Sequence, residues 1–402
     1  MRIMCNIYMG VKRRERSDIM KICLAMVYNG NPFEALGIEA LATYVQNFGY
    51  DVDLKMINSS KIKNSDILQL FKESYSFVGF SVSYSNINDT YQLCKIIKEN
   101  QNSKIFVGSQ YATLNAKEIL KDCEYIDFVI CGEGELVLKN ILDNYKIHTN
   151  INFIGQLDGV LTREKNEYSI VTIDKNLFIP IKHTLLGEKI FQNVLMARIY
   201  SSRGCCANCS FCTHNCYNTS KTWRGRSVKE VFDEMVDVHQ KYGISVFMFN
   251  DSSIEDPGFL GKARLEELCE HMLKYEDELY VFCYIRAETF SEKDGQLLEK
   301  MHSAGIVSLF VGIESANEKD LKLYNKIANV QQNEQAMQLF KNKGFRIMPG
   351  FIMFNPLSDT DTLYSNFMFC KKHELYLSCY YESQLAIFKG AKIESHIREK
   401  IY

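Results

Sequence analysis

The chain has 402 residues, a formal net charge of −2 and a pI near 6.5. This length is sufficient for about two domains, and the near-neutral charge disfavours nucleic acids and anionic membrane surfaces as partners. The sequence contains no apolar run of the ~18–20 residues that a membrane span needs, and no signal-peptide core at its start. We therefore expect a cytoplasmic protein without membrane association.

Residues 1–20 are predicted to be an extension, and residues 21–145 a first domain. In this domain short apolar runs alternate with amphipathic segments, a pattern typical of βα units with a parallel sheet. Strands are expected at 21–28, 51–57, 76–83, 104–109 and 127–132, and helices at 34–50, 89–101 and 115–122. This succession predicts a doubly wound, flavodoxin-like domain of the Rossmann type.

Residues 146–192 are predicted to be a linker, with a hairpin in "LDGVLTREKNEYSIVTI" (157–173). The βα alternation then restarts and continues over a second domain at 193–388. Strands are expected at 194–200, 245–250, 279–286, 307–313, 346–353 and 376–388, with helices at 227–242, 259–274, 291–304, 330–343 and 360–373. Six units predict an incomplete (β/α)6 barrel, a partial TIM barrel, followed by a short C-terminal tail at 389–402.

The chain has fourteen cysteines, which in a reducing compartment do not form a disulfide framework. Most of them occur singly inside apolar elements. We expect six of these single cysteines to be buried and to behave as small hydrophobic residues: Cys23, Cys94, Cys269, Cys283, Cys370 and Cys379.

The stretch "SSRGCCANCSFC" (201–212) differs, because Cys205, Cys209 and Cys212 form a C-x3-C-x2-C pattern directly after a predicted strand. Thiolates are ligands for zinc, copper or iron–sulfur clusters, and three of them would leave one iron of a [4Fe–4S] cluster open. A zinc site completed by Cys216 or His214 is an alternative, disfavoured because a second knuckle is missing. A non-catalytic metal-binding or electron-transfer protein also stays open.

This cysteine stretch, with an aromatic residue before its third cysteine, resembles the cluster loop of the radical S-adenosylmethionine (SAM) superfamily. The resemblance implies that Cys205, Cys209 and Cys212 bind a [4Fe–4S] cluster whose open iron binds SAM. An electron from the cluster would cleave SAM to a 5′-deoxyadenosyl radical that abstracts a hydrogen from the substrate. The backbone of Phe211 would lie at the adenine of SAM.

Polar residues at three further strand ends match the SAM-binding positions of this superfamily less closely. Asn250 and Asp251 are expected near the amino group of SAM. Arg286, Glu314 and Ser315 stand at positions that resemble the carboxylate- and ribose-binding positions. All of them follow strands on the side of the barrel where the cysteine loop is expected.

The first domain resembles the cobalamin-binding domains that precede such barrels, in its stretches "GFSVSYSNINDTYQLCKIIKE", "KIFVGSQYAT" and "DFVICGEGE". Small residues at these strand ends would admit the nucleotide tail of cobalamin. The D-x-H-x-x-G loop of His-ligated cobalamin proteins is missing, so the domain supplies no histidine below the cobalt. The resemblance implies cobalamin contacts at Ser81, Ser83, Gly108, Ser109, Gln110, Gly132, Glu133 and Gly134.

These features predict a cobalamin-dependent radical SAM enzyme, most simply a methyltransferase that acts on an unactivated carbon. The alternative within the superfamily is a cobalamin-free enzyme that forms a ring, dehydrogenates or epimerises. The expected partners are a small-molecule or peptide substrate and an electron donor such as flavodoxin or ferredoxin. The residues do not identify the substrate.

Overall fold

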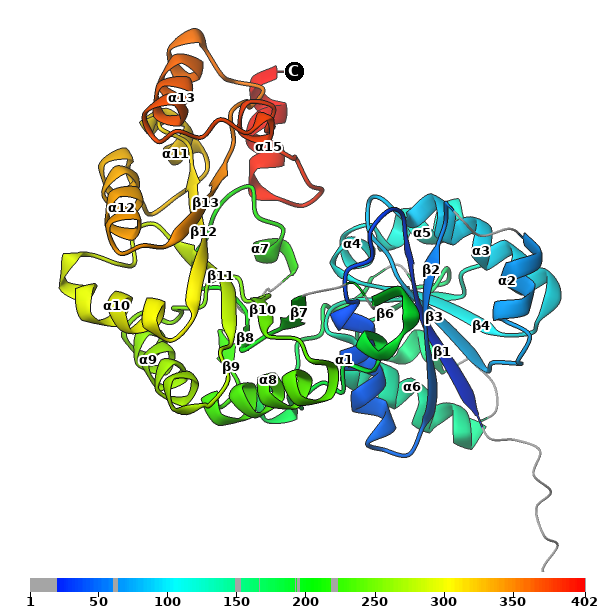
Figure 1. The fold of residues 1–402 in the computed structure, drawn as a ribbon. Helices are drawn as coiled ribbons and strands as arrows, with labels where there is room; N and C mark the ends of the chain where they lie inside the picture. The colour runs from blue at the N-terminus through cyan, green and yellow to red at the C-terminus, as the bar shows by residue number, and fades with distance from the viewer. Residues whose placement is uncertain are drawn as a thin grey trace, which may run out of the picture.

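The structure, a computed structural model, describes residues 20–60, 64–148, 153–165, 167–191, 193, 196–217 and 223–401. Two largely parallel sheets, each packed against helices, lie next to each other (Figure 1). Apart from residue 20, the predicted N-terminal extension lies outside the described residues, as do residues 194 and 195 of one predicted strand. Among the helices of the described ranges, none is both long and apolar enough to cross a membrane.

The first sheet has the strand order β2-β1-β3-β4-β5-β6, and its first five strands are parallel. Its strands are β1 Lys21–Tyr28, β2 Asp51–Asn58, β3 Phe77–Ser81, β4 Lys104–Gly108, β5 Phe128–Ile130 and β6 Val160–Leu161. Its helices are α1 Leu36–Gln46, α2 Asn64–Leu70, α3 Ile87–Asn100, α4 Gln110–Leu114, α5 Ala116–Asp122 and α6 Gly134–His148. Helices α1 and α6 bury apolar side chains against one face, and α2 to α5 against the other.

The register of the first sheet aligns the carboxyl ends of three strands. Ser81 is opposite Gly108, which is opposite Ile130. The loops that follow these strands therefore meet at one edge of the sheet, beside the point where the strand order reverses, between β1 and β3. Ligands of open α/β sheets bind at such a switch point.

Both arms of the predicted hairpin are attached to the end of β5. Val160 pairs antiparallel with Ile130, and Val171 forms a bridge with Gly132. Gly132 has a φ of +100°, and a Cβ there would lie 2.2 Å from the Val171 carbonyl oxygen, so only glycine fits this crossing. Within 153–165 and 167–191, the two arms form no ladder with each other.

The second sheet is parallel with the order β13-β12-β11-β10-β7. Its strands are β7 Met196–Ile199, β10 Val246–Phe249, β11 Tyr280–Arg286, β12 Ile306–Glu314 and β13 Arg346–Phe351. The helices of this part are α7 His214–Tyr217, α8 Val228–Tyr242, α9 Gly258–Lys274, α10 Gly295–Ser303, α11 Glu318–Leu323, α12 Val330–Asn342, α13 Thr360–Lys372, α14 Ser378–Tyr381 and α15 Lys392–Ile401. A two-stranded ladder, β8 Ser202–Arg203 with β9 Arg224–Gly225, flanks the cysteine loop.

The sixth predicted strand, at 376–388, is wrong as a regular strand. Its first part forms α14, and only Gln384 makes a bridge, to Phe354. Tyr376 and Leu377 are 69% and 65% exposed, so the apolar run there does not bury a strand face. The sixth position of the partial barrel is therefore a short pairing along residues 383–385.

Alternate residues of β7, β10, β11 and β12 point to opposite faces of the second sheet. One set, which includes Phe247, Cys283 and Leu309, is fully buried against the surrounding helices. The other set is only partly buried and forms the concave face of the partial barrel. Of the six cysteines predicted to be buried, five are, whereas Cys379 is exposed.

Candidate active site

The cysteine loop is anchored to the chain that follows β12. The Ser210 amide donates to the Tyr324 carbonyl over 2.8 Å, and the Ser210 hydroxyl donates to the Leu323 carbonyl over 2.6 Å. The ring of Phe211 packs edge-on against the Tyr324 ring, with centroids 5.6 Å apart. These contacts hold the loop between β7 and β12 at the carboxyl end of the second sheet.

Within the loop, Cys205, Cys209 and Cys212 are partly buried. Burial raises the pKa of the Cys205 thiol to about 11, and the neighbouring charges of Asp256 and Cys209 act in the same direction. Burial also raises the pKa of Cys209, and there the charge of Cys212 contributes. The three thiols of the pattern thus lie on one partly buried loop, where soft ligands for one metal centre would be needed.

The other two cysteines of this region have different surroundings. Cys206 is exposed, and its backbone amide donates to Asp256 Oδ2 over 3.0 Å. The Cys216 thiol donates to the Gly390 carbonyl, 2.8 Å away. Cys216 therefore ties α7 to the C-terminal segment.

Arg286, at the end of β11, lies among three carboxylates beside the loop. Its guanidinium is 2.6 Å from Asp256, 3.3 Å from Glu288 and 3.7 Å from Glu255. Burial lowers the pKa of Arg286, but these carboxylates outweigh it and raise the pKa above its ordinary value. Because Asp256 also receives the Cys206 amide, it connects Arg286 directly to the cysteine loop.

Glu314, at the end of β12, has a φ of +66°, a backbone conformation that non-glycine residues rarely adopt. The pairing register between β12 and β13 also shifts between Gly312 and Glu314. The Glu314 carboxylate lies 3.7 Å from the Lys326 ammonium, which donates to the Gly312 carbonyl over 3.1 Å. Burial raises the pKa of Cys209, and the Lys326 charge opposes that rise, so this ion pair lies near the second cysteine. Such local strain is common at functional sites.

Two predicted SAM contacts are engaged inside the protein. The Asp251 carboxylate accepts the Ser201 amide over 2.9 Å and hydroxyl hydrogen bonds from Ser201 and Ser202. The fully buried Ser315 hydroxyl lies 3.0 Å from Asp320 and 2.9 Å from Asn366. Both side chains support loops at the carboxyl edge, and their contact with SAM stays a prediction.

A cavity of about 360 Å³ lies where the first sheet meets the cysteine-loop region. Six of the eight residues predicted to contact cobalamin line it: Ser81, Gly108, Ser109, Gly132, Glu133 and Gly134. Ser83 and Gln110 are not among its lining residues; the Ser83 hydroxyl instead lies 3.0 Å from that of Ser85. Asn250 lines the cavity too, where its side-chain oxygen accepts from Arg198 over 3.2 Å.

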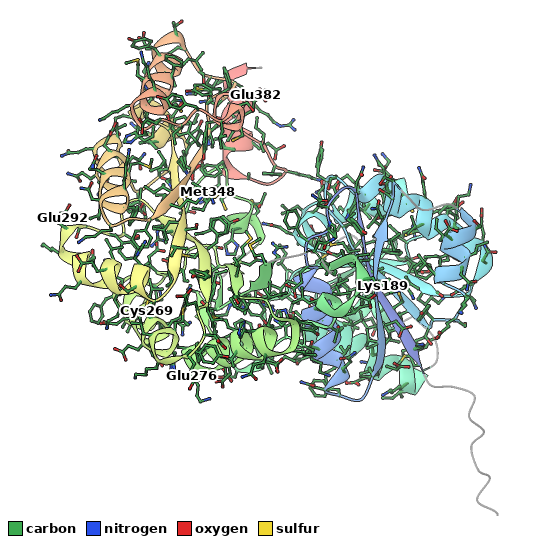
Figure 2. All side chains as sticks on the ribbon, in the orientation of Figure 1. Lys189, Cys269, Glu276, Glu292, Met348 and Glu382 are labelled. Carbon is green, nitrogen blue, oxygen red and sulfur yellow. The ribbon has the colours of Figure 1, made fainter. Side chains whose placement is uncertain are left out.

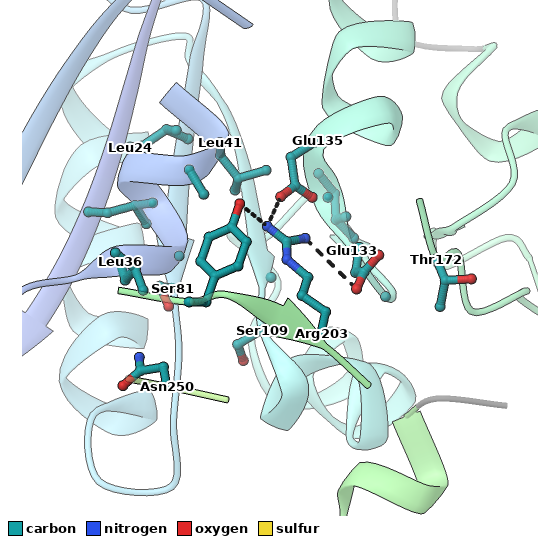
Figure 3. A pocket seen from close by; sticks show the side chains of 18 of the residues that line it. Leu24, Leu36, Leu41, Ser81, Ser109, Glu133, Glu135, Thr172, Arg203 and Asn250 are labelled. Carbon is teal, nitrogen blue, oxygen red and sulfur yellow. Dashed lines mark hydrogen bonds and ion pairs between the residues drawn. The ribbon is translucent and has the colours of Figure 1, made fainter. Parts of the chain in front are cut away.

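Arg203 forms an ion pair with Glu135 of the first domain at this cavity (Figure 3). Arg224, which also lines the cavity, forms one with Glu133. Arg203 Nη2 is 2.6 Å from Glu135 and 3.1 Å from the Tyr200 hydroxyl, and Arg224 donates to both oxygens of Glu133 over 2.7 and 2.8 Å. Burial raises the pKa of Glu133, but the two arginines outweigh it and lower the pKa below its ordinary value.

The cavity and the cysteine loop are contiguous. Gly204, which precedes the first cysteine, and His214, two residues after the third, both line the cavity. The Gln110 amide donates to the Thr213 hydroxyl over 2.6 Å, from α4 to the end of the loop. A ligand in this cavity would therefore be next to a cluster on the loop.

Sequence reasoning missed the residues that surround the predicted positions. These are Arg203, Arg224, Glu135, Glu255, Asp256, Glu288 and Lys326, while His214 was considered only as a zinc ligand. Two signals for them are visible in the sequence: the charged stretch "SIEDP" (253–257) after a strand, and the arginine two residues before Cys205. The residues with which these side chains pair lie far away in the chain.

Residues 23–142 match the family model described as a B12 binding domain, and residues 199–363 match the radical SAM superfamily model. An uncharacterized methyltransferase, PH0819, of Pyrococcus horikoshii is 28% identical over 351 residues, which cover 85% of this chain and 73% of that protein. The anaerobic magnesium-protoporphyrin IX monomethyl ester cyclase of Rubrivivax gelatinosus is 27% identical over 66% of this chain and 48% of its own length.

Two solved structures share the fold over most of the chain. The cobalamin-dependent S-adenosylmethionine radical enzyme OxsB, with aqua-cobalamin and S-adenosylmethionine bound, has a TM-score of 0.79 at 17% identity. That match covers 95% of this chain and 61% of OxsB. The methyltransferase TsrM of Kitasatospora setae has a TM-score of 0.73 at 15% identity, over 88% of this chain and 71% of TsrM.

The fold and the site define an α/β protein in which an open parallel sheet precedes a partial barrel with a cysteine loop. The chain belongs to the radical SAM enzymes that carry an N-terminal B12-binding domain. This confirms the predicted fold class. The cofactors of these enzymes are a [4Fe–4S] cluster, SAM and cobalamin, as the sequence predicted.

Proposed function

We propose that this protein is a cobalamin-dependent methyltransferase that acts on an unactivated carbon of a small-molecule or peptide substrate. The observation that carries the proposal is the shared wall of two sites: Gly204 and His214 belong to the cysteine-loop segment and also line the cavity of the B12-binding domain. Methyl transfer by a radical route needs a methyl carrier next to the SAM site, and a cobalamin in this cavity would be in that position.

Cys205, Cys209 and Cys212 would hold the [4Fe–4S] cluster. They fit this group because their thiols are soft ligands on one partly buried loop. Cys216 is engaged with the Gly390 carbonyl, which weakens the case for a fourth protein ligand. Asp256, which receives the Cys206 amide, would keep the loop backbone in place.

The first-domain cavity would hold the nucleotide tail of cobalamin, since 360 Å³ is too small for the whole molecule. The cavity wall leaves room for a ligand at Gly108, because a Cβ added there would lie at least 3.7 Å from the nearest other atom. When bound, the cluster would supply the electron that cleaves SAM, and cobalamin would supply the methyl group. The Arg203 and Arg224 ion pairs would keep the two domains closed around that group.

Five further residues would bind or position SAM, namely Phe211, Asn250, Arg286, Glu314 and Ser315. Glu314 has the best support, because its strained backbone aims the carboxylate over Gly312 next to the cysteine loop. Arg286 would bind or position SAM together with the three carboxylates beside it, those of Asp256, Glu288 and Glu255. Asp251 would act through the loop that it holds, at residues 201 and 202.

Curated relatives that carry methyltransferase names support the reaction class. They include the hopanoid C-3 methylase of Methylococcus capsulatus, 24% identical over 78% of this chain and 60% of that protein. The cyclases among the relatives make ring formation the competing outcome. An electron donor such as flavodoxin or ferredoxin would reduce the cluster.

The test is anaerobic reconstitution with iron, sulfide and hydroxocobalamin, followed by incubation with SAM and dithionite. We expect cluster absorbance and 5′-deoxyadenosine from the wild type and from Cys206→Ala and Cys216→Ala, but neither from a triple alanine variant of Cys205, Cys209 and Cys212. A full cluster in the triple variant would disprove the ligand assignment. With substrate and deuteromethyl-SAM, a product that gains no labelled methyl would disprove methyl transfer.

A further inference from the structure

A buried cluster of two carboxylates and one histidine lies apart from the cysteine loop. Its members are Glu34 in the loop after β1, Glu39 on α1 and His183 in the linker, and each of them is only 1% exposed. One ligand atom of each side chain, a carboxylate oxygen or a ring nitrogen, lies within 4.8 Å of those of the other two. Carboxylate and imidazole groups that converge in this way are typical of metal sites.

Each of the two carboxylates binds one backbone amide with one of its oxygens. Glu34 Oε2 accepts the Arg198 amide, and Glu39 Oε1 accepts the Leu185 amide, both over 2.7 Å. Glu39 Oε2 is buried and has no hydrogen-bond donor among the described residues, although the Glu39 carboxyl lies within hydrogen-bond reach of Glu34. Two buried carboxylates in contact need a proton or a cation between them.

The histidine is oriented as a metal-binding histidine is. His183 Nε2 lies 3.0 Å from Glu234, which accepts from Arg226 over 2.6 Å, and the other ring nitrogen, Nδ1, contacts Glu34. Histidine ligands generally donate the hydrogen of their second nitrogen to a carboxylate in this way. The backbone of His183 has a φ of +49°, which non-glycine residues rarely adopt and which is common at functional sites.

The charges around the cluster suit a divalent cation. Glu34 and Glu39 together would neutralise two positive charges, while Glu234 and Arg226 neutralise each other in their own ion pair. Arg198 also lies beside Glu34 and would oppose a second cation. Its guanidinium, however, donates to the Glu34 backbone carbonyl over 3.3 Å, which leaves the carboxylate oxygens to the cluster.

We propose that Glu34, Glu39 and His183 bind one divalent cation such as Mn²⁺, Fe²⁺ or Zn²⁺, for which carboxylates and imidazole are suitable ligands. The cation would replace the Nδ1 hydrogen that contacts Glu34, and this proton would leave to solvent. It would attach the linker to α1 and to the loop after β1. Figure 2 shows Lys189, six residues after His183, on the side of the first domain, where Leu185 is part of the core.

The probe is Mn²⁺, added to the full chain that carries alanine at Cys205, Cys209 and Cys212, so that no thiol of this loop pattern competes for it. Solution EPR counts the free Mn²⁺, and pulsed EPR detects a ligand nitrogen. We expect one bound Mn²⁺ per chain with one coupled nitrogen, and a higher midpoint of thermal unfolding. Absence of binding, or binding without a coupled nitrogen, would overturn the proposal and leave a shared proton between the two carboxylates.

Variants locate the cation. Glu39→Gln keeps an acceptor for the Leu185 amide but removes the charge, and should weaken Mn²⁺ binding by about tenfold or more. His183→Gln should remove the nitrogen coupling. The matched control, Glu267→Gln, changes an exposed carboxylate on α9 and should leave Mn²⁺ binding unchanged. Unchanged affinity in Glu39→Gln, or a nitrogen coupling that persists in His183→Gln, would overturn the proposal.

The Mn²⁺ assay needs neither SAM nor cobalamin, so its result is independent of the proposed function. Mn²⁺ binding at this cluster without SAM cleavage by the reconstituted wild type would support the cation site and disprove the enzyme proposal. SAM cleavage without Mn²⁺ binding would overturn the cation site alone.

Discussion

Arg203 and Glu135 form a 2.6 Å ion pair between segments 68 residues apart, one beside the cysteine loop and one at the start of α6. The arginine also lies over the rings of Phe178 and Tyr200, at 4.8 and 4.6 Å from their centroids. The cation is thus held by a carboxylate and two aromatic faces. This arrangement links the wall of the B12-binding cavity to the position of the first cysteine.

We predict that Arg203→Gln lowers cobalamin affinity at least tenfold. Removing one partner of a buried ion pair leaves the glutamate charge uncompensated, at a cost of about 3–5 kcal/mol, so the cavity wall should rearrange. Titration of hydroxocobalamin followed by absorption measures the effect. Lys229→Gln is the control, because its ion pair with Asp233 is exposed and should contribute little. Wild-type affinity in Arg203→Gln would contradict the assigned role.

Gly108 allows a graded test of the cavity itself. A Cβ there would touch only Ile130, at 3.7 Å or more, so Gly108→Ala should keep cobalamin. Gly108→Trp should fill the space for the nucleotide tail and reduce the cobalamin that co-purifies from a cobalamin-importing host by at least tenfold. Equal cobalamin content in the two variants, both folded by circular dichroism, would show that the tail enters elsewhere.

The regular elements could be predicted because their patterns are local. Alternating burial in "LYVFCYIR" and "VSLFVGI" is a property of neighbouring residues, and β11 and β12 lie where it indicates. Residues 376–388 have a similar apolar content, but Tyr376 and Leu377 are turned to solvent around α14. Composition alone does not show whether the rest of the fold supplies a surface to bury a segment.

The functional site likewise contains some residues that the local sequence reveals and others that only the fold brings together. Three cysteines within eight residues are brought together by their own loop, so their spacing reveals them. Arg224 and Glu133 are 91 residues apart and meet only because two domains pack. Asp251 is a polar strand-end residue, and nothing in the sequence signals that its carboxylate accepts hydrogen bonds from Ser201 and Ser202.

Glu314→Gln and Arg286→Gln should each weaken SAM binding about ten- to hundredfold while leaving the cluster absorbance unchanged. Each loses a charge next to the cysteine loop, and a charged hydrogen bond contributes about 1.5–3 kcal/mol. Equilibrium dialysis with labelled SAM on the reconstituted protein gives the affinity. Lys319→Gln, which breaks an exposed pair with Asp359, is the control. Wild-type SAM affinity in both test variants would mean that the SAM site lies elsewhere.

His183 joins three segments of the chain through a buried charge cluster. Its Nδ1 contacts the Glu34 carboxylate in the loop after β1, and its Nε2 is 3.0 Å from Glu234 on α8. Glu234 also accepts from Arg226 over 2.6 Å. Burial alone lowers the pKa of His183, but the hydrogen bonds and charges of Glu234 and Glu34 outweigh it and raise the pKa to about 10.

A protonated His183 therefore stabilises the folded protein in a defined pH range. Because the pKa is about 6.5 in the unfolded chain and about 10 in the fold, the stabilisation is complete below pH 6.5 and is lost as the pH rises to 10. We predict that His183→Gln lowers the free energy of unfolding by about 3–5 kcal/mol at pH 6.5 and that this difference shrinks toward pH 10. Urea unfolding at several pH values measures it, with His396→Gln on the exposed side of α15 as the control. A difference between wild type and His183→Gln that stays constant with pH would mean that His183 is neutral in the folded protein.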